Sequence, residues 1–373
     1  MIIGNTTLTL TEEQGMLMDV AREFCRDKSP VSAVREQLDT ELGYDAGVWK
    51  EMITLGWTGI ALPEHCGGSG LGVSALVPVF EAMGRALLGT PLLTTSLAAQ
   101  LVMRAAGAAQ ESVLADIAGG KIATLALTED ADWGREHFAV SLDKNGTLSG
   151  MKRFVPDAAV AELFVVPVQR EGELVIALVG ASQLPAGAIR PNTLIDETKR
   201  AANVDFTGVS VDENSVISGG QVVNAINDTR LIGALLVAAE ATGSAGACLD
   251  TIVDYLKTRK QFGKLIGSYQ ALKHPTVDIL IDTDSSRSFI YHAAAVVGDE
   301  TLDRDGEIAC RMAKAQATDT LLQAGDRAIQ FHGGMGFTYE CNAQLYLRRA
   351  QWSQQQFGDA QHHRTRLAKL LLD

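Results

Sequence analysis

The chain has 373 residues, of which 46% are hydrophobic and 21% are charged. This length exceeds the usual size of a single hydrophobic core, so we expect two or three packed regions and not a small free-standing module. The formal net charge of −13 argues against nucleic acid or an anionic membrane as the main partner. A local basic pocket for a phosphate group remains compatible with this charge.

Features typical of secretion, membrane insertion and metal binding are missing from the sequence. No uninterrupted apolar run approaches the roughly 20 residues that span a bilayer, and residues 1–7 do not resemble a signal peptide. The five cysteines are odd in number, widely spread and without C-x-x-C spacing, which fits a reducing compartment. We expect a cytoplasmic protein without a metal, in which His332, His362 and His363 are surface or interface residues.

Residues 1–120 are predicted to form an N-terminal helical domain. Apolar residues recur there at helical spacing, as in Met16, Val20 and Phe24, with almost no alternating runs. Thr11, followed by two glutamates, is typical of a helix N-cap with acidic residues in the first turn.

Residues 121–218 are predicted to form a small antiparallel β domain. Short β-type runs, separated by Gly, Asp and Asn, occupy residues 122–127, 163–168 and 174–179. Strand-sized segments of this kind end the helical pattern of the preceding region.

Residues 219–373 return to helical periodicity after a Gly-Gly pair. Long amphipathic stretches are predicted at residues 229–259, 270–297 and 305–331. Helices of this length pack as an up-and-down bundle. The predicted order is therefore helices, sheet and helical bundle.

Three motifs in a fixed order carry a resemblance to a known family. They are Leu62 to Gly70, Tyr255 to Gly267 with Gln270 and His274, and Gln330 to Arg349. At this spacing they resemble the acyl-CoA dehydrogenase family over essentially the whole chain. The resemblance implies a mainly α fold with a central β domain, in which an N-terminal helical domain and a small antiparallel β domain precede a C-terminal four-helix bundle.

The resemblance also implies an activity and its partners. The family oxidises an acyl-CoA thioester to the 2,3-enoyl form: a carboxylate removes the C2 proton while the C3 hydrogen leaves as hydride to FAD. Binding must stabilise the enolate-like charge and place the flavin within transfer distance. The implied acceptor of the electrons is an electron-transfer flavoprotein, and the implied assembly is a tetramer.

In this family FAD lies at a subunit interface, and the neighbouring subunit holds part of its pyrophosphate and adenosine. The residues of this chain that match that part of the site are Arg259, Gln261, Phe262, Gln270, Gln330, Gly333 and Gly334. Arginine can pair with a phosphate through its planar fork, and two glycines let the backbone approach a pyrophosphate closely. Taken alone, the glycines would suit a plain turn and the arginine a solvated helix end.

The part of the FAD site that the β domain supplies departs from the family. The resemblance implies a Thr-Glu-Pro strand end followed by a Gly-Ser-Asp turn, whereas segment 128–134 keeps only Thr128 and Glu129. A Trp-Ile-Thr segment is implied where the chain has residues 152–157, and Pro156 there removes a hydroxyl group and a backbone N–H. The half of the site that binds the flavin ring is therefore predicted to be degraded.

The catalytic base of the family is missing as well. Counted from Arg348 and Gly358, the position of the usual glutamate is Phe357, which cannot accept a proton. Some members carry the base on the first long helix of the bundle, but the aligned residues here, Gly233 and Ala234, are equally inert.

Two nearby carboxylates are alternative bases. Asp359 lies two residues beyond Phe357, and Glu240 lies six or seven residues beyond the second base position, about two helical turns away. For both we favour the interpretation as solvated or ion-paired carboxylates.

Three hypotheses about function follow. In the first, the chain is a subunit of a hetero-oligomeric (α2β2) acyl-CoA dehydrogenase, as in the bacterial members of the family that act on steroid side-chain acyl-CoAs, and it supplies the adenosine half of a shared FAD site. In the second, it is a homotetramer that uses Asp359 or Glu240 as its base. In the third, it is a structural or regulatory relative without catalysis.

Overall fold

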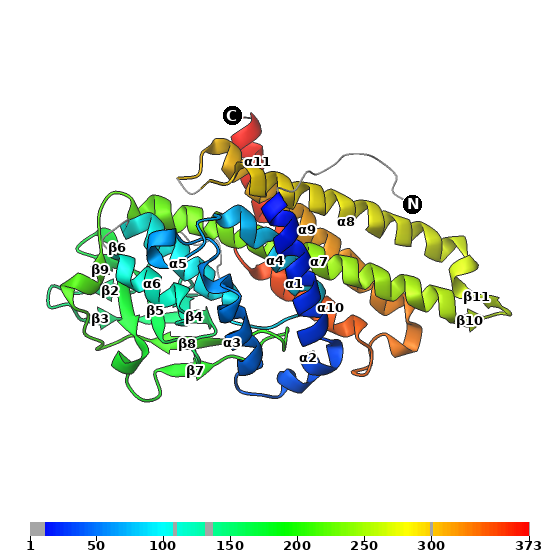
Figure 1. Ribbon diagram of the computed structural model, residues 1–373, viewed down its shortest axis with the longest axis horizontal. Helices are drawn as coiled ribbons and strands as arrows, with labels where there is room; N and C mark the ends of the chain where they lie inside the picture. Colours follow the sequence, from blue (N-terminus) through cyan, green and yellow to red (C-terminus); the bar gives the residue numbers. More distant parts are fainter. Residues whose placement is uncertain (1–11, 107–109, 131–136, 299–300, 373) are drawn as a thin grey trace.

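The fold is seen in a computed structural model that describes residues 12–106, 110–130, 137–298 and 301–372. The predicted N-cap Thr11, residues 1–7 and residues 131–134 of the altered turn lie outside this part of the chain. Figure 1 shows an elongated molecule with the β domain at one end and a hairpin of two short strands at the other. Long helices connect these two ends, and the N-terminal helices pack alongside them. The predicted mainly α fold with a central β domain is confirmed.

The N-terminal helices form one wall of the molecule. They are α1 (Glu12–Lys28), α2 (Val31–Leu38), α3 (Ala46–Thr54), α4 (Leu76–Arg85), α5 (Leu92–Ala106) and α6 (Glu111–Ala118). Asp45 begins α3 as an N-cap, because its carboxylate accepts hydrogen bonds from the backbone N–H groups of Gly47 and Val48. The predicted break at residues 62–70 is irregular chain with a single 3-10 turn at Glu64–Cys66.

The β domain contains two sheets. Its strands are β1 (Ala123–Leu125), β2 (Ser141–Leu142), β3 (Leu148–Ser149), β4 (Met151–Pro156), β5 (Leu163–Arg170), β6 (Glu173–Gly180), β7 (Ile189–Pro191), β8 (Ala201–Asp205) and β9 (Val216–Ile217). The first sheet has the order β3-β2-β5-β6-β9 with β1 beside β5, and the second has the order β4-β8-β7.

The larger sheet is mixed, which corrects the prediction of a purely antiparallel domain. Strands β1 and β2 both run parallel to β5, whereas the β5–β6 hairpin is antiparallel over its whole length. Strand β4 lies between β2 and β5 in the sequence but belongs to the second sheet. When the chain returns to the first sheet at β5, it therefore runs in the same direction as β1 and β2. Short β-type runs do not reveal such a crossover, because a local pattern carries no information on strand direction.

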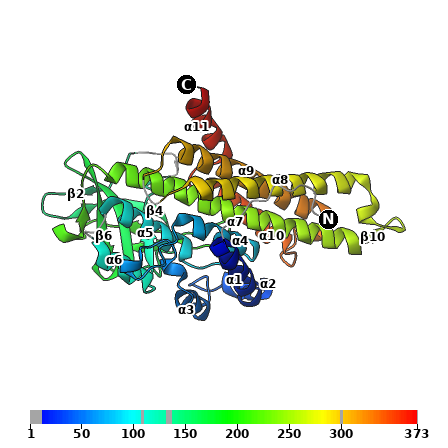
Figure 2. The same ribbon diagram turned by 45° about the horizontal axis from the view of Figure 1, so that its top comes forward.

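The C-terminal region is built on one very long helix. Its elements are α7 (Val222–Thr258), the hairpin β10–β11 (Lys260–Gln261 and Lys264–Leu265), α8 (Gln270–Val296), α9 (Arg304–Phe331), α10 (Ala343–Gln355) and α11 (Ala360–Leu372). Figure 2 shows α7, α8 and α9 lying side by side, with α11 projecting from the bundle. Helix α7 begins seven residues before the predicted start at Thr229, because Val222, Ala225 and Ile226 are buried and extend its core face.

Helix α7 is apolar and long enough to cross a membrane, with a mean hydropathy of 1.5 over its best window, of which 89% is buried inside the protein. It packs against α4, α5, α8, α9 and α10. These contacts identify α7 as the core helix of the molecule.

The N-terminal helices and the bundle meet at glycines. A Cβ at Gly243 of α7 would lie 1.9 Å from the carbonyl oxygen of Glu81 in α4, and a Cβ at Gly84 would lie 2.0 Å from the carbonyl oxygen of Glu240. Ser244 adds a hydrogen bond of 2.7 Å to the Gly84 carbonyl. Only glycine permits this approach of two backbones, so the two regions are locked together.

All five cysteines are reduced, and four of them are buried. Burial raises the pKa of Cys25 and of Cys310 to about 12. Cys341, which lies between η8 (Gly333–Met335) and α10, is the one that is partly exposed.

Candidate functional site

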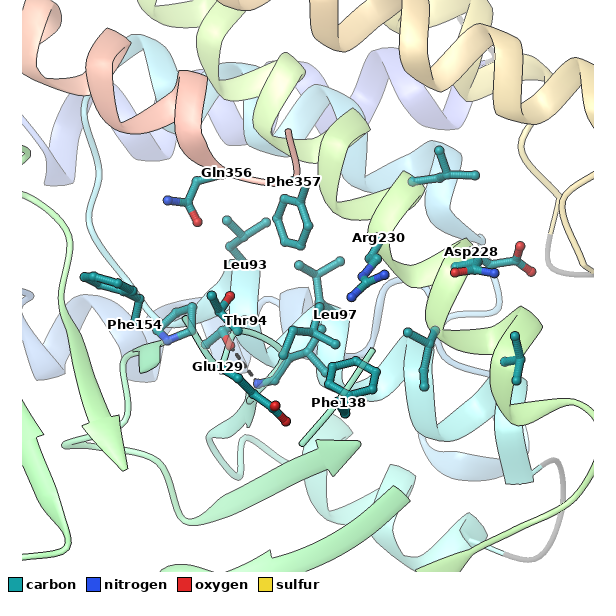
Figure 3. Close-up of a pocket in the computed structure, with 18 of the residues that line it drawn as sticks. Leu93, Thr94, Leu97, Glu129, Phe138, Phe154, Asp228, Arg230, Gln356 and Phe357 are labelled. Atoms are coloured by element: carbon teal, nitrogen blue, oxygen red, sulfur yellow. Dashed lines mark hydrogen bonds between the residues drawn. The ribbon is translucent and has the colours of Figure 1, made fainter. Parts of the chain in front are cut away.

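A cavity of about 1040 Å³ lies where the β domain, α5, the first turns of α7 and the α10–α11 turn meet. Figure 3 shows Leu93 and Leu97 of α5, Phe138 and Phe357 pointing into it, and Arg230 of α7 at its side. The volume matches that of small-molecule sites, which are about 300–1,000 Å³ and mostly apolar with a few polar groups. The cavity is therefore the candidate ligand site of this chain.

The two positions that hold the base in the family lie against each other: Phe357 lines the cavity, and Gly233 of α7 contacts its ring. The Phe357 ring is stacked so close to Gly233 that a Cβ at residue 233 would lie 2.7 Å from the Cζ atom of the ring and 2.8 Å from both Cε atoms. A ring and a glycine can neither accept nor donate a proton. The sequence indicated that neither residue can act as a base, but it did not indicate that the two residues touch each other.

The turn that carries Phe357 is fixed by a buried lysine. Phe357 and Gly358 have φ angles of 56° and 99°, and the Nζ of Lys314 donates hydrogen bonds to the carbonyl oxygens of Ser353 (2.9 Å) and Gly358 (2.7 Å). Lys314 is fully buried, and burial lowers its pKa to about 7. Through these two hydrogen bonds, Lys314 fixes the backbone turn that carries the ring of Phe357.

The prediction of a surface or interface residue is wrong for His363, which is only 1% exposed. His362 is partly exposed, and both histidines line the cavity. Helix α11 packs against α9, and this packing covers the imidazole ring of His363. Burial, with Lys314 and Arg311 nearby, lowers the pKa of His363 to about 2, so this histidine is neutral. His332, in contrast, stacks on Tyr255 at 4.2 Å between ring centres.

The two alternative bases have structural partners. Asp359 caps α11 by accepting a hydrogen bond of 2.7 Å from the backbone N–H of His362. Glu240 is fully buried, and its two carboxylate oxygens accept hydrogen bonds from the Nζ of Lys199 at 2.9 and 3.1 Å. Neither side chain lines the cavity as the described residues form it.

A buried ionic cluster joins the β domain to α10 and α7. Arg349 donates through Nε to Asp196 (2.5 Å) and through Nη2 to the hydroxyl of Thr198 (2.6 Å), and its Nη1 lies 3.9 Å from Glu240. Burial alone would raise the pKa of Asp196, but Arg349 and Thr198 outweigh it and hold this pKa below its usual range. The cluster has opposite charges on three elements, so it fixes how they pack.

On the β-domain side, Glu129 is held by a buried lysine. The Nζ of Lys152 donates to Glu129 (2.7 Å) and to the carbonyl of Pro167 (2.7 Å), and lies 4.2 Å from the centre of the Phe138 ring. Burial lowers the pKa of Lys152 to about 8, against the opposing effect of Glu129. Pro156 lines the cavity at the end of β4 and offers it no N–H group.

The seven residues predicted to hold part of FAD gather elsewhere, at the far end of the bundle. Arg259 follows α7, Gln261 and Phe262 belong to the β10–β11 hairpin, and Gln270 begins α8. Figures 1 and 2 both place this hairpin opposite the β domain. The stacked pair of Tyr255 and His332 joins the end of α7 to the end of α9, next to the remaining three residues, Gln330, Gly333 and Gly334.

This end of the bundle is exposed to solvent, and its residues suit the adenosine and pyrophosphate of FAD. Arg259, Gln261 and Gln270 are exposed, and Phe262 is 89% exposed with φ of 52°. A Cβ at Gly333 or Gly334 would meet nothing within 4 Å, so a ligand can approach this backbone closely. None of the seven residues lines the cavity of its own chain as the structure describes it.

The sequence also matches known proteins. It matches two family models, "Acyl-CoA dehydrogenase, N-terminal domain" over residues 11–121 and "Acyl-CoA dehydrogenase, C-terminal domain" over residues 223–372, which together cover more than half of the chain. The acyl-CoA dehydrogenase IpdE2 of Mycolicibacterium smegmatis is 29% identical over 363 residues, covering 96% of this chain and 98% of that protein.

Solved structures share the fold over nearly the whole length. A variant of the Tcur3481-Tcur3483 steroid ACAD has a TM-score of 0.86 at 26% identity, covering 98% of this chain and 99% of that one. The ChsE4-ChsE5 complex of Mycobacterium tuberculosis has a TM-score of 0.87 at 24% identity, covering 99% of each chain. The chain therefore belongs to the acyl-CoA dehydrogenase family, oxidoreductases that use FAD and act on the CH–CH bond of acyl-CoA thioesters.

Proposed function

We propose that this chain is the subunit without a base in a hetero-oligomeric acyl-CoA dehydrogenase, and that the end of its bundle completes an FAD site in a non-identical partner. The observation that carries the proposal is the separation of two features. The residues suited to the adenosine and pyrophosphate of FAD are exposed at one end of the molecule, whereas the chain's own cavity has Phe357 on Gly233 at both base positions.

In this arrangement each residue has a physical role. The guanidinium of Arg259 pairs with a phosphate, and Gly333 and Gly334 let the pyrophosphate approach the backbone. The exposed ring of Phe262 packs against the partner, which removes apolar surface from water. Bound FAD would supply the acceptor for the hydride that leaves C3 of the acyl group, and the partner would supply the base.

The relatives support an unequal assembly. The ChsE4-ChsE5 complex joins two differently named chains, and the Tcur3481-Tcur3483 protein is described as a steroid ACAD. By analogy, the substrate of the assembly containing this chain is an acyl-CoA with a steroid-derived acyl group, in an α2β2 tetramer with an electron-transfer flavoprotein as acceptor. A cytoplasmic location is part of the same proposal.

The decisive experiment measures the FAD-to-protein ratio of the chain purified alone and after co-expression with a second acyl-CoA dehydrogenase-like subunit. We expect a colourless chain alone and a yellow complex with one FAD for each pair of unequal subunits. Stoichiometric FAD on the chain alone would contradict the shared site.

Point variants then test the assignment within the complex. Arg259→Ala is expected to lower FAD occupancy because it removes a phosphate partner, and Arg259→Lys is expected to recover only part of it because lysine lacks the planar fork. Lys369→Ala, which removes an exposed charge near the end of α11, is the matched control. Full FAD occupancy in the Arg259→Ala complex would refute the role of this residue.

A further inference from the structure

We propose that the cavity of this chain is a binding site in its own right, which recognises an apolar alcohol. The hydroxyl of this ligand would lie in a polar corner formed by Thr90, Asp157 and Gln356. This inference does not depend on the proposed role of the bundle end in binding FAD.

Polar atoms in this corner lack partners within the protein. Thr90 is 7% exposed, and its hydroxyl oxygen is buried without a hydrogen bond. Gln356 is 8% exposed, and no described residue forms a hydrogen bond with its amide, which Figure 3 shows on the wall of the cavity beside Phe357. Buried polar groups are hydrogen-bonded in the great majority of cases, so the hydroxyl of Thr90 on the cavity wall is suited to pair with a polar group of a ligand.

Asp157 adds a carboxylate to the same corner. Its backbone is left-handed, with φ of 49°, and its N–H donates to the carbonyl of Arg200. Among the described residues no donor lies within hydrogen-bond distance of its carboxylate and no cation lies within 4.0 Å, although it lines the cavity. Burial raises the pKa of Asp157 to about 7, opposed by Lys199 and Arg200 and reinforced by Glu240.

Contacts between neighbouring segments bring the three residues to one place. Thr94, in the first turn of α5 after Thr90, shares a hydrogen bond of 2.9 Å with Thr124, whose hydroxyl donates at 2.5 Å to the carbonyl of Pro156. On the other side, the Nζ of Lys199 lies 4.7 Å from the centre of the Trp352 ring, one turn before Gln356. Segments 156–157, 199–200 and 352–356 thus meet beside the start of α5.

The chemistry of the corner selects a hydroxyl group. A carboxylate needs a donor, and an amide and a threonine hydroxyl can each donate to an oxygen, so one ligand hydroxyl can donate to Asp157 and accept from Thr90 or Gln356. A ligand carboxylate would meet the charge of Asp157 and is disfavoured. The adjoining walls, which include Leu93, Leu97 and Phe138, suit an apolar body of the ligand.

The two base positions of the family offer this ligand no proton acceptor. Phe357 and Gly233 occupy the positions from which a base would reach it, and neither can take a proton. The role that we propose for the site is therefore recognition of the ligand.

The test uses two bicyclic probes, decalol and its parent hydrocarbon decalin, titrated calorimetrically into the full-length chain. We expect decalol to bind about tenfold more tightly than decalin, because its hydroxyl forms hydrogen bonds that the hydrocarbon cannot form; a tenfold ratio corresponds to about 1.4 kcal/mol. Asp157→Asn keeps the volume but replaces a charged acceptor with a neutral one, so it should reduce this preference several-fold. Thr90→Val should reduce it several-fold.

The control is Asp19→Asn on the exposed face of α1, which should leave the preference unchanged. Equal binding of the two probes, or a preference for decalol that is unchanged in both Asp157→Asn and Thr90→Val, would overturn the proposal. Displacement of decalol by added FAD would overturn it too, because the cavity would then be a flavin site. The effect of Arg259→Ala on FAD content tests the shared site separately, so the two proposals can fail independently.

Discussion

Replacing Gly233 by alanine tests whether the ring of Phe357 blocks the second base position. The new Cβ would lie 2.7 Å from Cζ of Phe357, about 1 Å closer than the favourable carbon–carbon separation of roughly 3.5–4.0 Å. Phe357 cannot retreat freely, because Lys314 holds its turn through the carbonyl of Gly358. Overpacking of this kind costs about 1–3 kcal/mol.

Two effects of opposite sign therefore combine at this position. Alanine is favoured over glycine by about 1 kcal/mol within a helix, so Gly233→Ala should destabilise the protein by roughly 0–2 kcal/mol in the natural background. In the Phe357→Ala background the clash is gone, and the same change should stabilise by about 1 kcal/mol. The expected coupling between the two positions is about 1–3 kcal/mol.

Urea unfolding of the four proteins of this cycle measures the coupling as a difference in unfolding free energy. Gly15→Ala in α1 is the control for helix propensity alone, since a Cβ there would meet nothing within 4 Å. If Gly233→Ala has the same effect with and without the Phe357 ring, the ring does not block this position and the reasoning fails.

Two further predictions concern buried charges. Arg349→Ala should cost about 3–5 kcal/mol, because Asp196 remains buried without its charged partner, whereas Arg349→Lys should cost less because lysine keeps the positive charge. Equal losses of unfolding free energy for the two variants, measured in urea, would contradict the positive charge as the main contribution of residue 349. The pKa of Lys314 lies at about 7 in the folded chain and at about 10.5 in the unfolded chain, so between these values the unfolded state binds more protons and stability rises with pH. Lys314→Met should flatten that rise, and an unchanged pH dependence of unfolding between pH 7 and 10 would show that another group causes it.

The repetitive features of the fold could be predicted from the sequence, because they depend on local periodicity. The helices at residues 270–296 and 304–331 and the β5–β6 hairpin lie within a residue or two of the predicted stretches. The parallel pairing of β1 with β5 could not be predicted, since it depends on where the chain goes between them. The seven residues that the family motifs assign to FAD lie together at the end of the bundle, and their role in binding FAD stays a prediction.

The interior of the cavity was much less predictable. Phe357 and Gly233 are 124 positions apart in the sequence, and no local pattern indicates that one covers the other. His363 has the polar neighbours of a surface residue but is buried by the packing of α11 on α9. Asp157 follows Pro156, in the segment that departs from the family's Trp-Ile-Thr pattern. Its charge at the end of a β-type run was the one sequence signal for a polar group in the cavity.

Because four cysteines are buried and one is partly exposed, a fluorescent dye can be used to follow the docking of the partner subunit. Only thiolates react readily with maleimide dyes, and burial suppresses the thiolate form at Cys25, Cys66, Cys248 and Cys310. Cys341 is left as the one partly exposed site, in the loop that follows Gly333 and Gly334. A single dye can thus be attached to the natural sequence, close to the surface where the partner is proposed to dock, and its emission would follow docking in real time.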